Sequence, residues 1–516
     1  MSGSFPWLTT IGLVPLIGSV LVMLIPVART TLAKQIALVV SLITLGLTIA
    51  MALQFDATAT TPFQFVESTP WIPALGISYS VGVDGIGLVL VALATTLVPV
   101  VILAGWNDVE AAAGKGSVKG YFALLLVLET LMVGVFAATD LFLFYVFFEA
   151  MLVPIYFLIG RYGGAQRSYA AVKFLIYSLV GGLFMLASLI GVYVVSARIL
   201  GEGTFDFLSL VGLEMDSTTQ RLLFLGFFFA FAIKAPLWPF HTWLPDAAKE
   251  STPATAVLLI GVLDKVGTFG MIRYLLPIFP EASQFYAPVV IAMAVIGILY
   301  GALVALGQND MKRLFAYSSM SHFGFIALGI FVFTSQGGTG SVFYMLAHGL
   351  STAALFLTGG FLMMRRGGSS LISDYGGVAK VAPVLGGFLM FAAMASLALP
   401  GLAGFVGEFL VLLGTFSRYI WVGVIATLGI VFTAAYVLRF YQRTATGPSP
   451  AALVDMPDAR GREITSLAPI VLLTLVLGII PGPVLDVINP AVDRTLQIVG
   501  VTDPPPTIDS SEGGAP

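Results

Sequence analysis

Six ionisable side chains lie within stretches of this sequence that are otherwise apolar. The basic ones are Lys173, Lys234 and Lys265, and the acidic ones are Glu129, Glu149 and Glu408. A charge at the centre of a membrane helix costs about 2.5 to 3.5 kcal/mol on insertion scales, so such residues usually face other helices or internal water. Structural ion pairs are the alternative, but buried pairs are weak evidence for stability because desolvation offsets their attraction. The pattern favours a path for protons.

Lysine suits such a path when its environment changes. A solvated lysine has a pKa near 10.4 and keeps its proton at neutral pH. Burial can lower the pKa of a lysine by about 3 to 5 units, whereas a nearby carboxylate raises it again. A carboxylate that approaches and withdraws would therefore make a buried lysine bind and release a proton.

The three histidines extend the set of candidates. His322 and His348 fall within predicted spans, and His241 lies at the end of another. Histidine exchanges protons readily at physiological pH because its pKa is near 6.5. A single buried histidine is more often a hydrogen-bonded core residue, so that reading stays open for each. No metal site is expected, because no cluster with ligand spacing surrounds any of them.

The composition indicates which kind of secondary structure must position these residues. The chain has 516 residues, of which 58% are hydrophobic and 10% charged, against about 25% charged in soluble domains. Its apolar runs reach the roughly 20 residues that a spanning helix needs, whereas strands of a closed barrel show short alternation. There are no cysteines, which excludes disulfides and thiolate-bound metals within this chain. We expect an all-α polytopic membrane protein.

Fourteen transmembrane helices are predicted, and the first is expected to be retained because Met1–Pro6 lacks the basic region of a secretory signal. They cover residues 7–27, 35–54, 86–106, 121–138, 141–160, 173–196, 222–240, 255–276, 286–306, 315–334, 342–364, 383–414, 419–440 and 466–488. Lysine and arginine concentrate in loops after odd-numbered spans, while the opposite loops hold only Arg198, Arg221, Arg418 and Arg494. The positive-inside rule then puts both termini on the non-cytoplasmic side.

Two predicted spans are interrupted next to a charge. Pro236 and Pro239 follow Lys234 in span 7, and Pro400-Gly401 precedes Glu408 in span 12. Interrupted spans in corresponding positions indicate internal repeats. A separation of five helices predicts two inverted five-helix repeats with broken helices 7 and 12. The expected divisions are 1–120 (helices 1–3 and a loop), 121–276 (first repeat), 286–440 (second repeat), 441–490 (loop and helix 14) and 491–516 (disordered tail).

Several segments resemble the antiporter-like, proton-translocating subunits of respiratory complex I (NADH–quinone oxidoreductase), and most closely its chain M family. They are Asp140–Gly164, Lys234–Gly267, Asp310–Phe331 and Ser396–Leu410, together with Val83–Gly87 at the start of span 3. The likeness covers most of residues 80–490. Glutamate at position 408 favours chain M, because chains L and N usually carry lysine there.

The resemblance implies a role for each matched position. Glu149 would pair with Lys234, Lys265 would be the central relay, and Glu408 would pass the proton outward. His322 and His348 would support a water-filled connection. Further candidates are His241, Glu129, Lys173 and Asp264, the last standing where the family often has an apolar residue.

The resemblance also implies which cofactors the partner subunits bind, which partners this chain has and where it is located. NADH, FMN, iron–sulfur clusters and the ubiquinone or menaquinone would be bound by partner subunits, since this chain lacks a dinucleotide fingerprint. No cofactor or metal is expected in this chain. The expected partners are chains L and N, other membrane-arm subunits, the lipid bilayer and protons, but no nucleic acid. The expected location is the bacterial cell (inner) membrane.

Two other functions remain open from the sequence. One is a subunit of a multisubunit sodium/proton antiporter or of an energy-converting hydrogenase. The other is a membrane scaffold whose charges only pair with one another. Loss of proton pumping in an assembled complex after replacement of Lys234 would argue against the scaffold.

Overall fold

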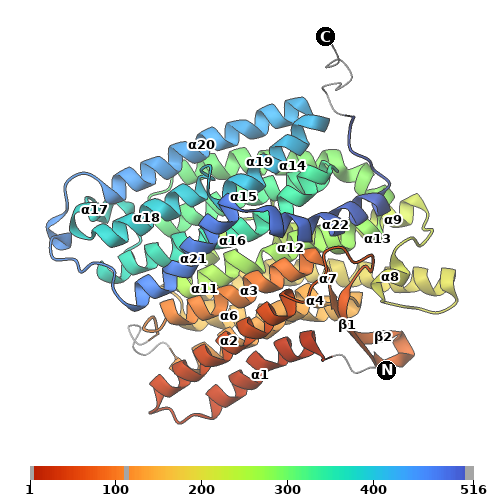
Figure 1. Ribbon diagram of the computed structural model, residues 1–516, viewed down its shortest axis with the longest axis horizontal. Helices are drawn as coiled ribbons and strands as arrows, with labels where there is room; N and C mark the ends of the chain where they lie inside the picture. Colours follow the sequence, from red (N-terminus) through yellow and green to blue (C-terminus); the bar gives the residue numbers. More distant parts are fainter. Residues whose placement is uncertain (1–4, 110–115, 506–516) are drawn as a thin grey trace.

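Long helices packed side by side form the body of the molecule (Figure 1). The computed structural model describes residues 5–109 and 116–505. Its first half contains α1 (Trp7–Leu24), α2 (Thr30–Ala52), α3 (Gly85–Ala104), α4 (Val118–Ala137), α5 (Leu141–Ala150), α6 (Leu152–Tyr162), α7 (Arg167–Leu200), α8 (Phe207–Leu210), α9 (Ser217–Lys234), α10 (Trp243–Glu250), α11 (Pro253–Leu258), α12 (Lys265–Gly270) and α13 (Leu276–Ile278).

The second half of the chain continues the same architecture. It contains α14 (Pro280–Leu306), α15 (Met311–Phe331), α16 (Ser335–Arg365), α17 (Val378–Val381), α18 (Pro383–Ser396), α19 (Ala403–Arg418), α20 (Ile420–Ala445), α21 (Arg462–Ile479) and α22 (Gly482–Val499). With α5–α6 and α11–α13 each taken as one span, twelve helical segments of the described residues are long and apolar enough to cross a membrane. The prediction of a helical, multi-span membrane protein is confirmed.

The two remaining predicted spans, 222–240 and 383–414, are the interrupted ones, so the count of fourteen stays a prediction. Helix α9 ends at Lys234, and the chain turns through residues 235–242 before α10 begins. Helix α18 ends at Ser396, and α19 begins only at Ala403. Proline explains both breaks, because it removes a backbone donor and its ring clashes with the preceding turn.

The C-terminal prediction was wrong in one respect. The sequence analysis expected one span over 466–488 and a disordered tail from 491. Instead, α21 ends at Ile479, and the separate helix α22 continues to Val499. The Pro481-Gly482-Pro483 sequence divides the two helices, because proline cannot continue a preceding helix but suits the start of the next. Helix α22 packs against α3 and α16.

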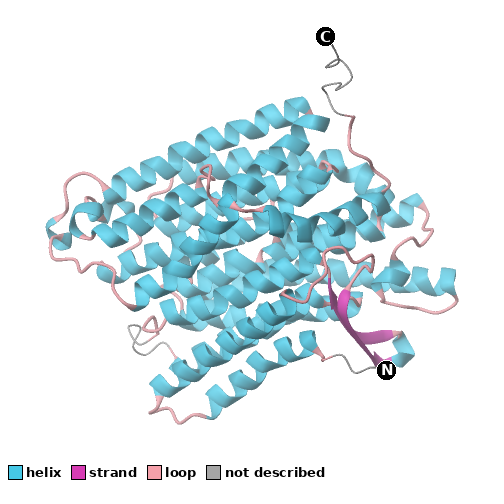
Figure 2. Ribbon diagram, in the orientation of Figure 1, coloured by secondary structure: helices cyan, strands magenta, loops and turns pink. Residues whose placement is uncertain are grey.

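A β-hairpin covers one end of the bundle (Figure 2). Strands β1 (Gln64–Ile72) and β2 (Ile77–Val83) pair in antiparallel register, between the second and third predicted spans. Glu67 of β1 accepts hydrogen bonds from the backbone amides of Leu8 and Thr9, at 2.8 and 3.3 Å. This carboxylate satisfies amides at the beginning of α1 that have no partner within the helix.

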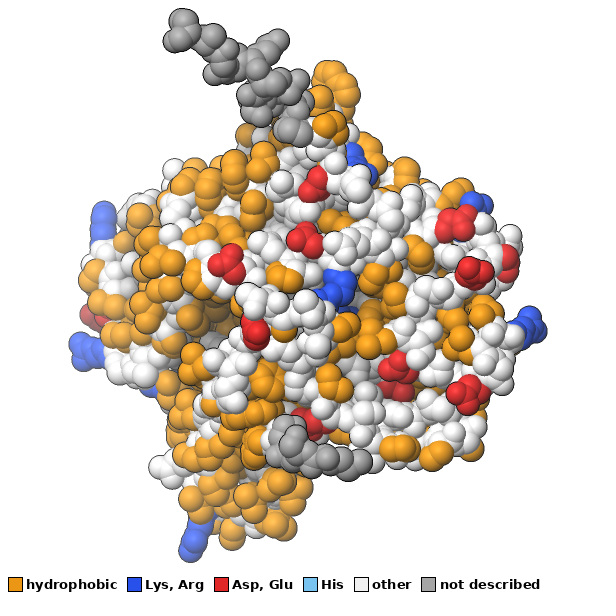
Figure 3. Space-filling view, turned by 45° about the vertical axis from the view of Figure 1, so that its right-hand side comes forward, with side chains coloured by type: hydrophobic (Ala, Val, Ile, Leu, Met, Phe, Trp, Pro, Cys, Tyr) orange, Lys and Arg blue, Asp and Glu red, His pale blue; other side chains and the backbone are white. Residues whose placement is uncertain are grey.

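The middle of the bundle is formed by α11–α13, α15 and α16. All residues of the most apolar stretches of α11–α13 and α16 are buried. Peripheral helices instead expose large apolar side chains such as Leu24 on α1 and Trp421 on α20, and orange hydrophobic side chains cover much of the face in Figure 3. Asp264 and Lys265, which lie on the central segment between α11 and α13, are therefore enclosed by protein.

Candidate proton-transfer site

Lys234 and Glu149 lie close to each other but share no hydrogen bond. Lys234 is the last residue of α9, and its side chain is buried. Its Nζ atom lies 4.7 Å from the centre of the Phe148 ring. Among the residues that the structure describes, neither this atom nor Oε1 of Glu149 has a hydrogen-bond partner. The two charges interact electrostatically. The expected pair is thus a charge interaction and not a hydrogen-bonded ion pair.

Two glycines of α7 make room for this arrangement. A Cβ atom built on Gly182 would collide with the carboxylate of Glu149, and one on Gly181 would lie 3.2 Å from the backbone of Ala230 in α9. The absence of both side chains lets α7 approach α5 and α9 closely. Gly182 therefore forms the wall against which the Glu149 carboxylate rests.

Lys265 stands at the centre of the bundle, where the helical winding changes. The segment Leu259–Leu263 is π-helical, and α12 begins immediately after Asp264. Such segments are rare and occur frequently at functional sites. The Nζ atom of Lys265 donates a hydrogen bond to the carbonyl oxygen of Ile260 at 2.6 Å and lies 2.7 Å from Nδ1 of His348.

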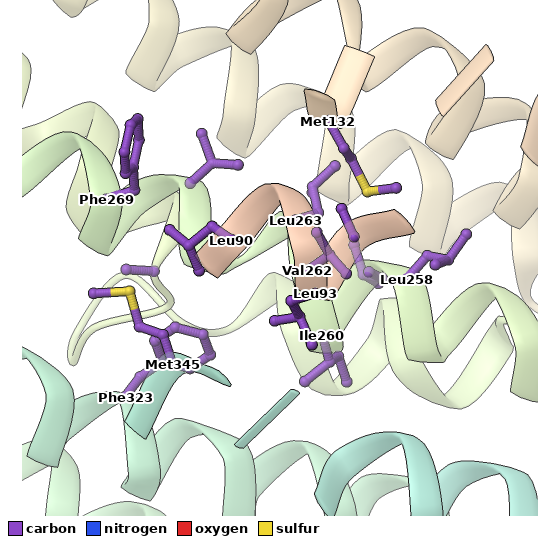
Figure 4. Packing of buried hydrophobic residues seen from close by; sticks show 14 of the residues in the cluster. Leu90, Leu93, Met132, Leu258, Ile260, Val262, Leu263, Phe269, Phe323 and Met345 are labelled. Carbon is purple, nitrogen blue, oxygen red and sulfur yellow. The ribbon is translucent and has the colours of Figure 1, made fainter. Parts of the chain in front are cut away.

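Apolar side chains surround the segment that carries Lys265 (Figure 4). Leu90 and Leu93 of α3, Met132 of α4 and Met345 of α16 belong to this shell, and all four are buried. The Lys265 Nζ atom also lies 5.1 Å from the centre of the Phe323 ring. A shell of low polarity strengthens the interactions among the charges that it encloses.

Asp264 is the acidic residue that the two lysines share. Its side chain is fully buried, and both carboxylate oxygens lack a hydrogen-bond partner among the described residues. It interacts electrostatically with both Lys234 and Lys265. Asp264 therefore contributes a carboxyl group near both lysines.

A series of neighbouring polar side chains continues from Lys265 into the second predicted repeat. The rings of His348 and His322 have their centres 5.4 Å apart. Nδ1 of His322 lies 2.6 Å from the hydroxyl oxygen of Tyr344, which is also a hydrogen-bonding neighbour of Glu408. These side chains are all buried. The groups from Lys265 to Glu408 thus lie in sequence through the core.

The sequence analysis missed several members of this chain. Tyr344 precedes His348 by four residues on α16, and Ser318 precedes His322 by four on α15, which puts each pair on one helix face. The Ser318 hydroxyl lies 3.3 Å from Nε2 of His322 and 2.6 Å from the hydroxyl of Tyr436. This spacing was the signal that could have found Tyr344 and Ser318.

Three predicted candidates lie outside the chain of contacts. Lys173 forms an ion pair with Asp246 at 2.7 Å, and Arg313 binds the other oxygen of that carboxylate at 2.9 Å. His241 is buried, with its ring centre 5.2 Å from that of Tyr300. Glu129 is fully buried in α4, and neither of its carboxyl oxygens has a hydrogen-bond partner.

Glu408 marks the far end of the chain. A cavity of about 280 Å³ at the break between α18 and α19 is lined by Glu408 together with Leu399 and Pro400. As for metals, no group of three or more His, Asp or Glu side chains in the described part of the chain is arranged to hold an ion. The arrangement provides groups that bind and release protons.

Known proteins share this fold and most of this sequence. A family model described as "NADH:quinone oxidoreductase/Mrp antiporter, TM" matches residues 138–433. NADH-quinone oxidoreductase subunit M of Mycobacterium tuberculosis is 53% identical, over 98% of this chain and 96% of that protein. The Rhodobacter capsulatus subunit M is 40% identical over 90% of each chain.

Solved structures agree with the sequence relatives. A chain in the structure of respiratory complex I from Thermus thermophilus with bound NADH superimposes with a TM-score of 0.86 at 30% identity, covering 96% of this chain and all of that one. The Mrp complex from Dietzia sp. shares the fold, with a TM-score of 0.80 at 22% identity, over 94% of this chain and 52% of that one. The chain belongs to the family of NADH-quinone oxidoreductase subunit M.

Proposed function

We propose that this chain is a proton-translocating subunit of a respiratory complex I and moves protons through its buried Glu, Lys and His side chains. The observation that carries the proposal is the 2.7 Å contact between Lys265 and His348 at the centre of the bundle. Two nitrogen bases at this distance can share a proton directly. The groups on either side of this contact extend it toward Glu149 and toward Glu408.

The path begins in the first repeat. Glu149 and Lys234 attract each other without a hydrogen bond, so the strength of the attraction depends on their separation. Movement of Glu149 away from Lys234 would weaken the hold of Lys234 on its proton. Asp264, which interacts with both lysines, would then favour a positive charge on Lys265.

The path continues in the second repeat. Lys265 would pass its proton to His348 across their direct contact. Transfer to His322 follows, either by movement of the rings or through a bridging water molecule. Glu408 would receive the proton at the far end and release it toward the non-cytoplasmic side.

The other parts of the proposal concern the assembly. NADH, FMN, iron–sulfur clusters and quinone would be bound by partner subunits, which supply the energy, so that this chain contributes translocation and no redox site. Chains L and N and other membrane-arm subunits would be its neighbours. We place the complex in the bacterial cell membrane, with both termini of this chain on the non-cytoplasmic side.

A Lys234→Ala variant tests the proposal in the assembled, reconstituted complex. NADH-driven acidification of vesicles should fall by about tenfold or more, as expected for loss of a proton-transfer group. Oxidation of NADH by an artificial acceptor should stay normal and report intact assembly. Lys173→Ala is the matched control, because Lys173 is ion-paired with Asp246. Normal acidification by the Lys234→Ala complex would support the scaffold reading and refute the relay.

A further inference from the structure

Tyr344 joins two groups that would otherwise have no direct contact in the path. Its side chain is buried in α16. The hydroxyl oxygen lies 2.6 Å from Nδ1 of His322, and the carboxyl group of Glu408 is its other hydrogen-bonding neighbour. The phenol therefore lies between the last histidine and the terminal glutamate.

We infer that the hydroxyl of Tyr344 relays the proton from His322 to Glu408. A hydroxyl group can donate one hydrogen bond and accept others at the same time. Tyr344 can therefore accept from the imidazole and donate to the carboxylate in one arrangement. This inference rests on the proposed function and names the residue that completes its outer end.

The transfer balances without a change in the charge of tyrosine. Nδ1–H of His322 gives its proton to the phenol oxygen, and the phenol O–H bond breaks as its proton moves to a carboxylate oxygen of Glu408. His322 loses one positive charge, Glu408 becomes neutral, and Tyr344 is neutral before and after. Rotation of the new O–H bond back toward Glu408 then resets the relay.

Neighbouring hydroxyls orient His322 for this step. Ser318 lies 3.3 Å from Nε2 of His322 and 2.6 Å from the hydroxyl of Tyr436. Which nitrogen of a histidine carries the proton depends on the hydrogen bond that the other nitrogen makes. When Ser318 accepts from Nε2–H, neutral His322 keeps its remaining proton on Nε2 after the transfer, and the proton that moves is the one on Nδ1, the atom that faces Tyr344.

The packing of α16 on α19 fixes the distance between Tyr344 and Glu408. A Cβ atom built on Gly407 would lie 2.6 to 2.9 Å from the Cβ, Cα and N atoms of Tyr344, and one on Gly340 would lie 2.7 Å from Leu410. These glycines let the two helix backbones approach closely. Glu408 follows Gly407 directly and is held beside the phenol.

A Tyr344→Phe variant of the assembled complex tests the relay, because phenylalanine keeps the ring and removes only the hydroxyl. We expect NADH-driven acidification to fall about tenfold, with normal NADH oxidation by an artificial acceptor. The matched control is Tyr274→Phe, which removes a buried hydroxyl whose hydrogen bond goes to the carbonyl oxygen of Ala138, outside the path. Its acidification should stay within about twofold of the unaltered complex, as for a neutral hydrogen bond outside the path.

The outcomes separate the inference from the proposed function. Normal acidification by Tyr344→Phe, together with its loss in Lys265→Ala, would overturn the relay and leave the proposed function standing. Normal acidification by Lys265→Ala would overturn the proposed function itself. Equal losses in Tyr344→Phe and Tyr274→Phe would also count against a specific role for Tyr344.

A second measurement covers the case in which Tyr344→Phe does not assemble. Incorporation of 3-fluorotyrosine at position 344 keeps the hydroxyl and nearly the size of the ring while making the hydroxyl more acidic. A relay predicts that the dependence of acidification rate on pH shifts relative to that of the unaltered complex. An unchanged profile would overturn the relay, because a purely structural tyrosine would not respond to its own acidity.

Discussion

The two predicted repeats hold their buried charges in different ways. In the first-repeat cluster (Glu149, Lys234 and Asp264), charges lie near one another, yet Lys234 Nζ, Glu149 Oε1 and both Asp264 oxygens have no hydrogen-bond partner in the described protein. In the second-repeat chain, His348, His322, Tyr344 and Glu408 follow one another through close contacts, and Lys265 stands at the junction.

Under the proposed function, the first-repeat cluster would control proton transfer and the second-repeat chain would conduct the proton. A buried polar group without a partner costs about 1 to 3 kcal/mol, so small movements in the first-repeat cluster change its energy and charge state strongly. Groups in the second-repeat chain have close partners, as the proposed proton transfer requires. We therefore expect coupling to the redox subunits to act on the first-repeat cluster.

Substitution of Lys265 should have the largest effect, because both regions meet at this residue. Lys265→Ala should reduce NADH-driven acidification by about a hundredfold, the lower range expected for loss of a general acid or base. Lys265→Arg should not restore it, because arginine keeps its proton. Restoration by arginine would show that only the positive charge matters and that Lys265 transfers no proton.

Gly407→Ala should disturb the second-repeat chain without removing any titratable group. The added Cβ would lie 2.6 to 2.9 Å from the Cβ, Cα and N atoms of Tyr344, so α19 must move away and take Glu408 with it. Acidification should fall about tenfold, because displacement by about 1 Å can cost more than that in a positioned site. Gly387→Ala is the control, since its Cβ would meet nothing within 4 Å. Equal effects of the two variants would contradict a positioning role.

The Asp264→Asn variant tests the role of the shared carboxylate in the first-repeat cluster. Asparagine keeps the shape of aspartate but removes the negative charge that interacts with Lys234 and Lys265. We expect acidification to fall about fivefold, corresponding to roughly 1 kcal/mol of lost attraction. The measurement is acidification normalised to NADH oxidation. An unchanged ratio would show that Asp264 only fills space.

Gly182→Ala should have a smaller effect on the same cluster. The new methyl group would collide with the carboxylate of Glu149, but this carboxylate ends a flexible side chain and can rotate away. Acidification should therefore fall only about twofold, at the low end of the effects of overpacking. Gly46→Ala, with no neighbour within 4 Å, serves as the control. A larger loss than in Gly407→Ala would contradict our expectation that the first-repeat cluster tolerates an added methyl group better than the second-repeat chain does.

Asp108 offers a reference outside both regions and should show the smallest effect. Burial raises the pKa of this carboxyl group to about 6, although Arg462 and Lys312 oppose the shift. Its contribution to stability is therefore present below about pH 4 and lost as the pH rises through about 6. Asp108→Asn should flatten the fall in melting temperature of the detergent-solubilised protein between these values. The same slope in both proteins would contradict this assignment.

The membrane-spanning class and most of the residues to be tested could be predicted from the sequence. Apolar runs long enough to cross a bilayer leave few alternatives, and charges within them are too costly to be common. Lys234, Lys265 and Glu408 were found for this reason. Prolines also revealed both helix breaks, because their effect on the backbone is local.

Which of these groups contact one another could be seen only in the tertiary structure. Lys265 meets His348 across 83 positions of sequence, Tyr344 meets Glu408 because glycines let α16 and α19 approach, and α22 folds back on α3 and α16. Lys173, a further candidate by sequence, is instead bound to Asp246. The cost of burying a charge is visible in a single segment, but its partner is set by how distant helices pack.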